Sequence, residues 1–285
     1  MISPIRDNTR NILVERIKSI EKEFNADCIC IDGPIAEELV SLSKSCVEDL
    51  ARDGKHERLC VLLTTNGGDV NTAERLVNIF RHHYSKVEFI VPDHAYSAGT
   101  LLCMSGDKIW MDYNSVLGPI DPQVVNKENK MYVPASGYVD KIRELLQKAQ
   151  NNTISEAEFL ILKDFDLAEL SLYEQAIELT VVLLQEWLVK YKFKDWDTHN
   201  SNGKKVTKEE KEERAKKIAE ELGNYNRWKT HGRPLSMEAL ASLKLQIDDY
   251  SDDIKKCNSI SNFHSMATDY KQLSKVEGFI FTRRM

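Results

Sequence analysis

VEFIVPDHAYSAGT, residues 87–100, is the stretch of sequence that decides the fold. Its first five residues form an apolar run of strand length that ends at Pro92, and small residues from Ala98 onward open a helix. Ser97 stands at this turn, where a hydroxyl is lifted above a sheet and the amides at the helix start can stabilise negative charge. The stretch therefore predicts a βα unit and a candidate nucleophile together.

The same alternation recurs on both sides of this stretch. Apolar runs at 28–31 and 59–63 are each followed by a turn and then by a segment with helical spacing of its apolar residues. Short strands are also expected at 108–111 and 279–281, and helices are expected after about residue 135. The pattern predicts an α/β protein with a mostly parallel sheet and helices on both faces.

Composition excludes several classes of protein. The chain has 285 residues, 42% hydrophobic and 29% charged, with a formal net charge of −6, so no general basic field for nucleic acid is expected. The start lacks the apolar region of a signal peptide, and no apolar segment is long enough for a membrane span. Six scattered cysteines indicate reduced thiols and a cytoplasmic protein, and no metal or cofactor is expected.

Two further segments belong with the Ser97 turn. Asn66-Gly67-Gly68-Asp69 directly follows the strand at 59–63, and paired glycines let a backbone turn tightly and present its amides. The rigid segment 117–122, LGPIDP, follows the expected strand at 108–111. In a parallel sheet all three segments would lie at the carboxyl ends of strands, where active sites form.

These motifs resemble a known group of proteins. The sequences DGPI (32–35), TNGGDV (65–70) and AYSAGT (95–100) are similar to the Clp-protease fold shared with signal peptide peptidase A. LGPIDPQ at 117–123, with VPAS at 133–136, resembles the SDH (serine dehydratase proteinase) family of Clp-fold serine proteinases. A segment at 228–239 is similar to the part that returns to the core in this fold.

The resemblance implies a fold and a division of the chain. The fold would be a ClpP/crotonase-like spiral of ββα units with a charged helical insertion. A core with the nucleophile would span 1–150, the insertion 151–226, and a segment returning to the core 227–285. We therefore expect the charged stretch at 197–217 to be a loop that leads into an exposed helix.

The resemblance also implies a serine peptidase that cleaves peptides or unfolded protein segments through an acyl-enzyme. Ser97 would be the nucleophile, and the oxyanion hole would use the amides of Gly67 or Gly68 and of Ala98. Assembly into a homo-oligomer and a separate regulatory or unfoldase partner are expected by the same analogy.

The general base is less clear, because this chain departs from the Clp pattern. Leu117-Gly118-Pro119 occupies the place of the Clp histidine, and neither His231 nor Gly232 supplies the Clp acidic partner. The signal peptide peptidase branch uses a lysine, so Lys141 is the expected base, with Lys130 and His231 as alternatives. His231 could instead be an auxiliary or a structural group.

Two other functions stay open at this point. A crotonase-type acyl-CoA enzyme would use the same oxyanion architecture without a nucleophile. A catalytically inactive scaffold would have kept the fold and lost the base.

Overall fold

The centre of the molecule is a six-stranded sheet with the order β10-β1-β2-β3-β5-β9. β10 runs antiparallel to β1, and all other neighbours are parallel, as the sequence predicted. The computed structural model describes residues 4–52, 54, 56–125, 132–199 and 203–285. The strands are β1 (Asp27–Asp32), β2 (Arg58–Thr64), β3 (Lys86–Ile90), β5 (Lys108–Met111), β9 (Asp248–Asp249) and β10 (Phe279–Thr282).

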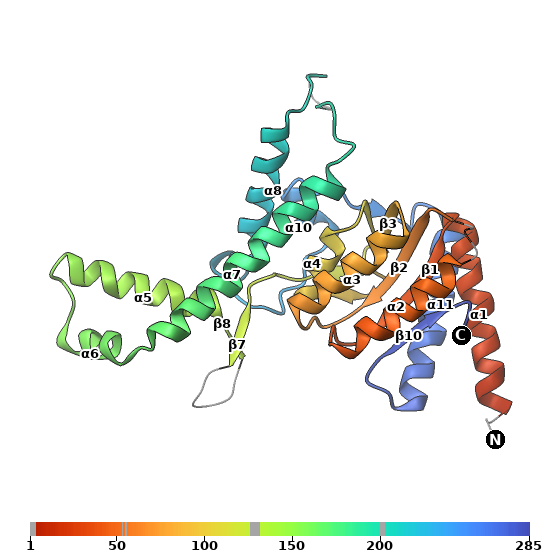
Figure 1. The fold of residues 1–285 in the computed structure, drawn as a ribbon, viewed down its shortest axis with the longest axis horizontal. Helices are drawn as coiled ribbons and strands as arrows, with labels where there is room; N and C mark the ends of the chain where they lie inside the picture. The colour runs from red at the N-terminus through yellow and green to blue at the C-terminus, as the bar shows by residue number, and fades with distance from the viewer. Residues whose placement is uncertain (1–3, 53, 55, 126–131, 200–202) are drawn as a thin grey trace.

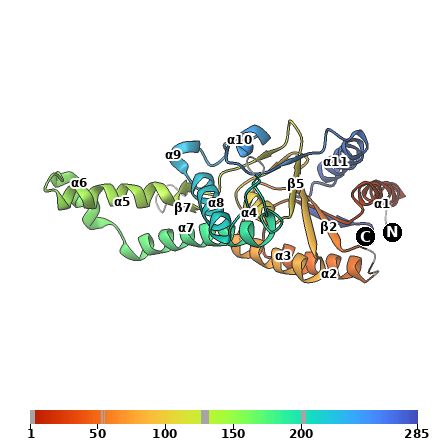
Figure 2. The ribbon, with the colours of Figure 1, turned by 90° about the horizontal axis from the view of Figure 1, so that it is seen from above.

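Helices cover both faces of this sheet, as Figures 1 and 2 show. Because side chains alternate along a strand, neighbouring residues of β1 enter different cores: Ile29 packs on one side and Cys28 on the other. All six cysteines are free. One face carries α2 (Glu38–Ala51), α3 (Val70–His83) and α4 (Ala98–Met104), and the other carries α1 (Pro4–Phe24) and α11 (Ile254–Ser274).

A small second layer lies beyond the carboxyl ends of the central strands. In it β4 (His94–Ala95) pairs in parallel with β6 (Val116–Leu117), so that Ala95 faces Leu117. Leu117 also forms an antiparallel bridge with Leu235, which comes from much later in the chain. This layer brings three distant segments side by side, two of them within a few residues of the expected site.

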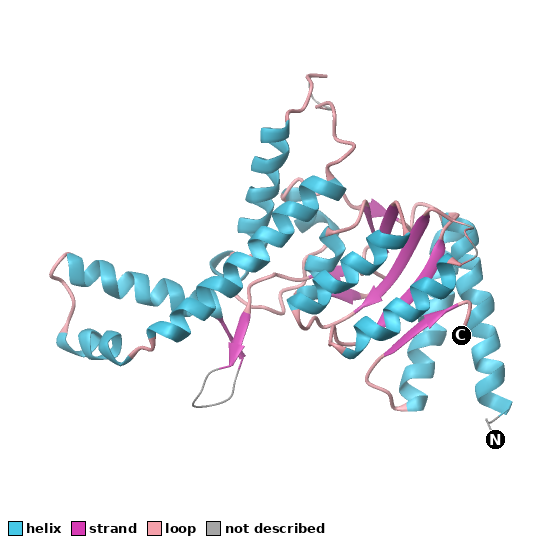
Figure 3. Ribbon diagram, viewed as in Figure 1, coloured by secondary structure: helices cyan, strands magenta, loops and turns pink. Residues whose placement is uncertain are grey.

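A helical arm projects from the sheet (Figures 1 and 3). It follows a two-stranded antiparallel hairpin of β7 (Gln123–Val125) and β8 (Tyr132–Pro134). We use "the arm" for residues 135–182. They form α5 (Ala135–Gln150), α6 (Glu156–Asp164) and most of α7 (Leu167–Trp187).

The chain then returns to the core. Leu184 and Trp187 at the end of α7, and Ala215 and Ile218 of α8 (Lys208–Leu222), join the same apolar cluster as α3 and α4. The segment expected as an insertion therefore has two parts, an arm that projects and a later part that builds the core. A π-helical turn (Leu188–Lys192) extends α7, and α9 (Tyr225–Trp228) and α10 (Met237–Ser242) follow α8.

Candidate active site

Ser97 occupies a strained turn between β4 and α4. Its backbone has φ +54° and ψ −118°, a conformation that costs a residue with a side chain about 1–3 kcal/mol. The turn is held by the Gly99 amide, which donates to the Tyr96 carbonyl at 2.8 Å, and by the Leu101 amide, which donates to the Ser97 carbonyl at 3.1 Å. Among the described residues the Ser97 hydroxyl has no hydrogen-bond partner. These bonds thus fix the backbone at Ser97, and the hydroxyl is left without a protein partner among the described residues.

The glycine loop after β2 lies directly against this turn. A Cβ atom on Gly67 would come within 2.8 Å of Ser97 Cβ, and one on Gly68 within 2.2 Å of the Ile35 carbonyl oxygen. Ile35 fixes the loop from the other side, since its amide donates to the Gly67 carbonyl at 2.9 Å and its carbonyl accepts from the Asp69 amide at 2.8 Å. Only glycine fits at these two positions.

Two amides near Ser97 remain available. The Gly67 amide is already used, because it donates to Thr65 Oγ1 at 3.0 Å. Within the described part of the chain, neither the Gly68 amide nor the Ala98 amide donates to a protein acceptor. Of the expected oxyanion donors, Gly68 and Ala98 are therefore the pair with free amides.

Electrostatics around the turn come from carboxylates at its edges. Although burial acts in the opposite direction, hydrogen bonds from Thr72 bring the pKa of Asp69 below its ordinary value, and Asp69 caps α3 through the Thr72 amide at 2.7 Å. Burial, with a smaller effect of Asp93, raises the pKa of Tyr96, whose ring stacks on His94 at 5.2 Å. These contacts hold the side chains of Asp69 and Tyr96, which flank the site, in place.

The segment after β6 passes beside the Ser97 turn. A Cβ atom on Gly118 would lie 2.5 Å from Tyr96 Cδ1, so this close approach needs glycine. The Gly118 amide donates to Thr100 Oγ1 at 2.9 Å, and that hydroxyl donates to the Ala95 carbonyl at 2.7 Å. The segment is thereby tied to both ends of the Ser97 turn.

Three residues beyond Gly118 stands a buried carboxylate with a histidine partner. Asp121 is 1% exposed, and its Oδ1 lies 3.0 Å from His231 Nδ1, while its Oδ2 accepts from Gln123 Nε2 at 2.7 Å. A carboxylate accepts hydrogen bonds, so His231 carries its proton on Nδ1. In the neutral ring Nε2 is then the nitrogen without a proton, and within the described residues no other group bonds to it. A partly exposed histidine held in this tautomer is able to accept a proton.

The pairing of β6 shows at which of its ends Ser97 and His231 lie. Ser97 comes two residues after Ala95, and Ala95 pairs with Leu117. His231 comes four residues before Leu235, which bridges Leu117 in the antiparallel sense. Ser97 and His231 therefore both lie beyond the carboxyl end of β6, and Asp121 follows that same end in the chain.

The prediction of the base followed the order of groups in the Clp pattern. It looked for a histidine in the segment 117–122 and for a carboxylate near His231, and found neither. In the structure, the segment 117–122 supplies a carboxylate, Asp121, and the histidine that contacts it is His231. The aspartate in the LGPIDP segment was the available signal.

Lys141, the expected base, has different surroundings. Its side chain is 58% exposed on α5, and its ammonium pairs with Glu144 of the same helix at 2.9 Å. Figure 1 shows α5 in the arm, away from α4, which begins directly after Ser97. Lys141 thus lacks the burial that would keep a lysine neutral. Lys130 lies outside the described residues.

The described residues hold no group of three or more His, Cys, Asp or Glu side chains arranged for a metal ion. Over the same ranges no helix combines the length and the apolar character needed to cross a bilayer.

Comparison with known proteins places this geometry in context. The model of a family described as ClpP-like SDH-type serine proteinase matches residues 43–207. Two uncharacterized proteins of Methanocaldococcus jannaschii are similar to the chain, one 40% identical over 70 residues and the other 26% identical over 213 residues. These matches cover 25% and 75% of this chain, but only 24% and 57% of the two relatives. Among solved structures, ClpP1 from Listeria monocytogenes is 12% identical with a TM-score of 0.43, over 82% of this chain and 93% of that chain.

Proposed function

Because the chain belongs to the family of ClpP-like SDH-type serine proteinases, we propose that it is a peptidase with Ser97 as nucleophile, His231 as general base and Asp121 as the carboxylate that orients His231. Its substrates are peptides or unfolded protein segments. The observation that carries this assignment is the 3.0 Å contact between the buried Asp121 and the partly exposed His231, beyond the carboxyl end of β6.

The reaction follows from these groups. His231 Nε2 takes the Ser97 hydroxyl proton as Oγ forms a bond to the carbonyl carbon of the scissile peptide, and the carbonyl electron pair moves onto oxygen. The amides of Gly68 and Ala98 stabilise this oxyanion. When the C–N bond breaks, Nε2 gives its proton to the leaving amine and an ester on Ser97 remains. A water that loses its proton to Nε2 then attacks the ester, which releases the acid and restores Ser97.

The choice between the two bases rests on their surroundings. A histidine needs no shift of its pKa to act near neutral pH, whereas a lysine must be kept neutral by burial. Lys141 is exposed and pairs with Glu144. His231 is turned toward Asp121 by a hydrogen bond that leaves Nε2 available. These contacts favour a Ser-His-Asp arrangement over the Ser-Lys pair predicted from the sequence.

Labelling with a fluorophosphonate probe tests the assignment. We expect the wild-type protein to be labelled, Ser97→Ala to be unlabelled, and His231→Gln to react at least about 10²-fold more slowly. Lys141→Ala is the matched control, and it should react like the wild type. If Lys141→Ala abolished labelling while His231→Gln left it unchanged, lysine would be the base. Thermal denaturation of each variant shows whether it is folded.

We also propose that copies of the chain assemble into a homo-oligomer. The arm carries large apolar side chains that are more than half exposed, which supports a contact between copies of the chain. They include Phe159, Leu160, Ile161, Leu167 and Leu172. Light scattering after size-exclusion chromatography measures the number of subunits directly.

A further inference from the structure

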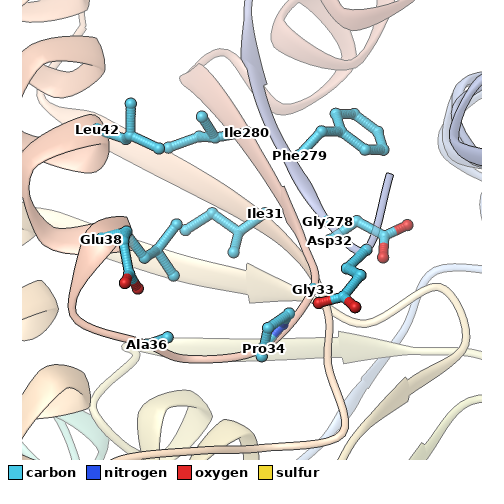
Figure 4. Close-up of a pocket in the computed structure, with 12 residues that line it drawn as sticks. Ile31, Asp32, Gly33, Pro34, Ala36, Glu38, Leu42, Gly278, Phe279 and Ile280 are labelled. Atoms are coloured by element: carbon cyan, nitrogen blue, oxygen red, sulfur yellow. The ribbon is translucent and has the colours of Figure 1, made fainter. Parts of the chain in front are cut away.

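A pocket at one edge of the sheet is lined by none of the residues that take part in the proposed mechanism. It lies between α2 and the edge strand β10, near the point where β1 ends (Figure 4). Figure 4 shows Leu42 and Ile280 on one side of it and Pro34 and Ala36 on another. Leu42 is 49% exposed, so its side chain is available to a ligand.

The strand beside this pocket has an open edge. β10 is the last strand of the sheet, and among the described residues no strand pairs with its outer side. At the end of β10, the Thr282 carbonyl accepts from the Met285 amide at 3.3 Å, a bond within the same part of the chain. An open edge offers unpaired amides and carbonyls to an added strand.

The rim of the pocket carries unbalanced negative charge. Glu38 and Glu277 line it, both are exposed, and within the described part of the chain neither forms an ion pair. The third acidic residue, Asp32, is neutralised by Lys271 at 2.5 Å. Two carboxylates beside an apolar pocket favour a ligand that brings apolar and basic side chains together.

The pocket is also connected to the Ser97 site through the backbone. Pro34 and Ala36 line it, and the residue between them, Ile35, holds the glycine loop through its bonds to Gly67 and Asp69. A ligand that packs against Pro34 and Ala36 therefore contacts both neighbours of Ile35, the residue that holds the loop containing the Gly68 amide.

We propose that this pocket and the outer edge of β10 bind an extended segment of a partner polypeptide, in which a leucine-like side chain has a lysine or arginine two residues before and two residues after it. The segment adds to β10 as a further strand, and because every second side chain of a strand points to the same face, the apolar side chain enters the pocket beside Leu42 while the two basic side chains lie on the same face, toward Glu38 and Glu277. A second copy of this acidic chain fits the rim less well, because its net charge is −6.

Fluorescence anisotropy with a labelled Lys-Thr-Leu-Thr-Lys peptide, whose leucine and lysines share one face of a strand, tests the proposal, with the Ser97→Ala protein used throughout to prevent cleavage. We expect binding that weakens with salt and becomes at least about tenfold weaker on Leu42→Lys or on Glu38→Gln combined with Glu277→Gln. Leu146→Lys, a change of a similarly exposed leucine on α5 (45% against 49% for Leu42), is the matched control and should bind normally.

Two altered peptides sharpen the result. Glu-Thr-Leu-Thr-Glu should not bind, and the lysine peptide N-methylated at every residue should lose binding, because it cannot donate backbone hydrogen bonds to a strand. Equal binding of either peptide, or Leu42→Lys binding within about twofold of the unmodified site, overturns the proposal. So does a dimer that Leu42→Lys dissociates, since the occupant is then a second copy.

The proposal stands apart from the peptidase assignment. Leu42→Lys in a protein that retains Ser97 should react with the fluorophosphonate probe, because Leu42 takes no part in the chemistry. Loss of peptide binding with full labelling supports the binding site alone. Full peptide binding in a protein that never reacts with the probe would contradict the peptidase assignment alone.

Discussion

Replacing Asp121 by asparagine is the sharpest test of the base. The two side chains have the same shape, and the site is 1% exposed, so we expect the fold to be kept. The carboxylate now accepts two hydrogen bonds, from His231 Nδ1 at 3.0 Å and from Gln123 Nε2 at 2.7 Å. An asparagine whose oxygen stays with Gln123 turns its amide group toward Nδ1. That nitrogen must then become an acceptor, and the ring proton moves to Nε2.

The magnitude follows from the tautomer. With a proton already on Nε2, His231 cannot take the proton of Ser97, and the ring also loses the negative charge that stabilises its cationic form. The same exchange in the serine-protease triad lowers the rate about 10⁴-fold. At about 1.4 kcal/mol for each factor of ten, this corresponds to roughly 5 kcal/mol in the barrier. An effect of this size is far beyond the experimental error of a rate measurement.

The assay is the second-order rate of reaction with a fluorophosphonate probe, measured with the melting temperature of each protein. Asp140→Asn makes the same chemical change on α5, where Asp140 is exposed and accepts only a long bond from Asn226 at 3.4 Å, and it should react normally. If folded Asp121→Asn reacted within about tenfold of the wild type, the reasoning from the Asp121–His231 pair would be refuted.

Two other predictions concern stability. Arg283 bonds to Asp27 at 2.7 Å and to Glu21 at 2.5 Å, and Asp27 is fully buried. Arg283→Met leaves these two carboxylates without their cation. We therefore expect it to lower the free energy of unfolding, measured in urea, by about 3–5 kcal/mol. A loss below about 1 kcal/mol would contradict this. Burial lowers the pKa of Lys192 from 10.5 to about 8, so the folded state binds this proton more weakly than the unfolded state and stability should rise between those pH values. Lys192→Met should therefore be more stable than the wild type at pH 7, and this advantage should shrink toward pH 10. An advantage that stays constant across this range would show that charge burial is not its cause.

Much of the fold was predictable because its evidence is local. The apolar runs at 59–63 and 87–91 are buried on both faces, and the strand at 279–281 was also expected correctly. The turn at Ser97 and the glycine loop follow from short motifs, since tight turns depend on the residues within them. What local pattern predicts well is the part of the site that lies next to the nucleophile.

The rest depends on contacts between distant segments. Asp121 and His231 are 110 residues apart in the chain, and they meet because Leu235 pairs with Leu117. No spacing in the sequence reports such a bridge. Lys141 does lie on a helix after Pro134, as expected, but the direction in which that helix leaves the core is set by packing. The contacts that favour His231 over Lys141 as the proposed base are therefore contacts of the tertiary structure.

The arm described above lies, in chain order, between Asp121 and His231. During synthesis the ribosome therefore makes the nucleophile and its glycine loop first, then more than a hundred residues of hairpin, arm and core helices, and only afterwards the histidine. A nascent chain that has already formed its first strands still lacks His231, the base that we propose for Ser97. In the proposed mechanism, the order of the segments therefore leaves the growing polypeptide without that base until the bridge between Leu117 and Leu235 has closed.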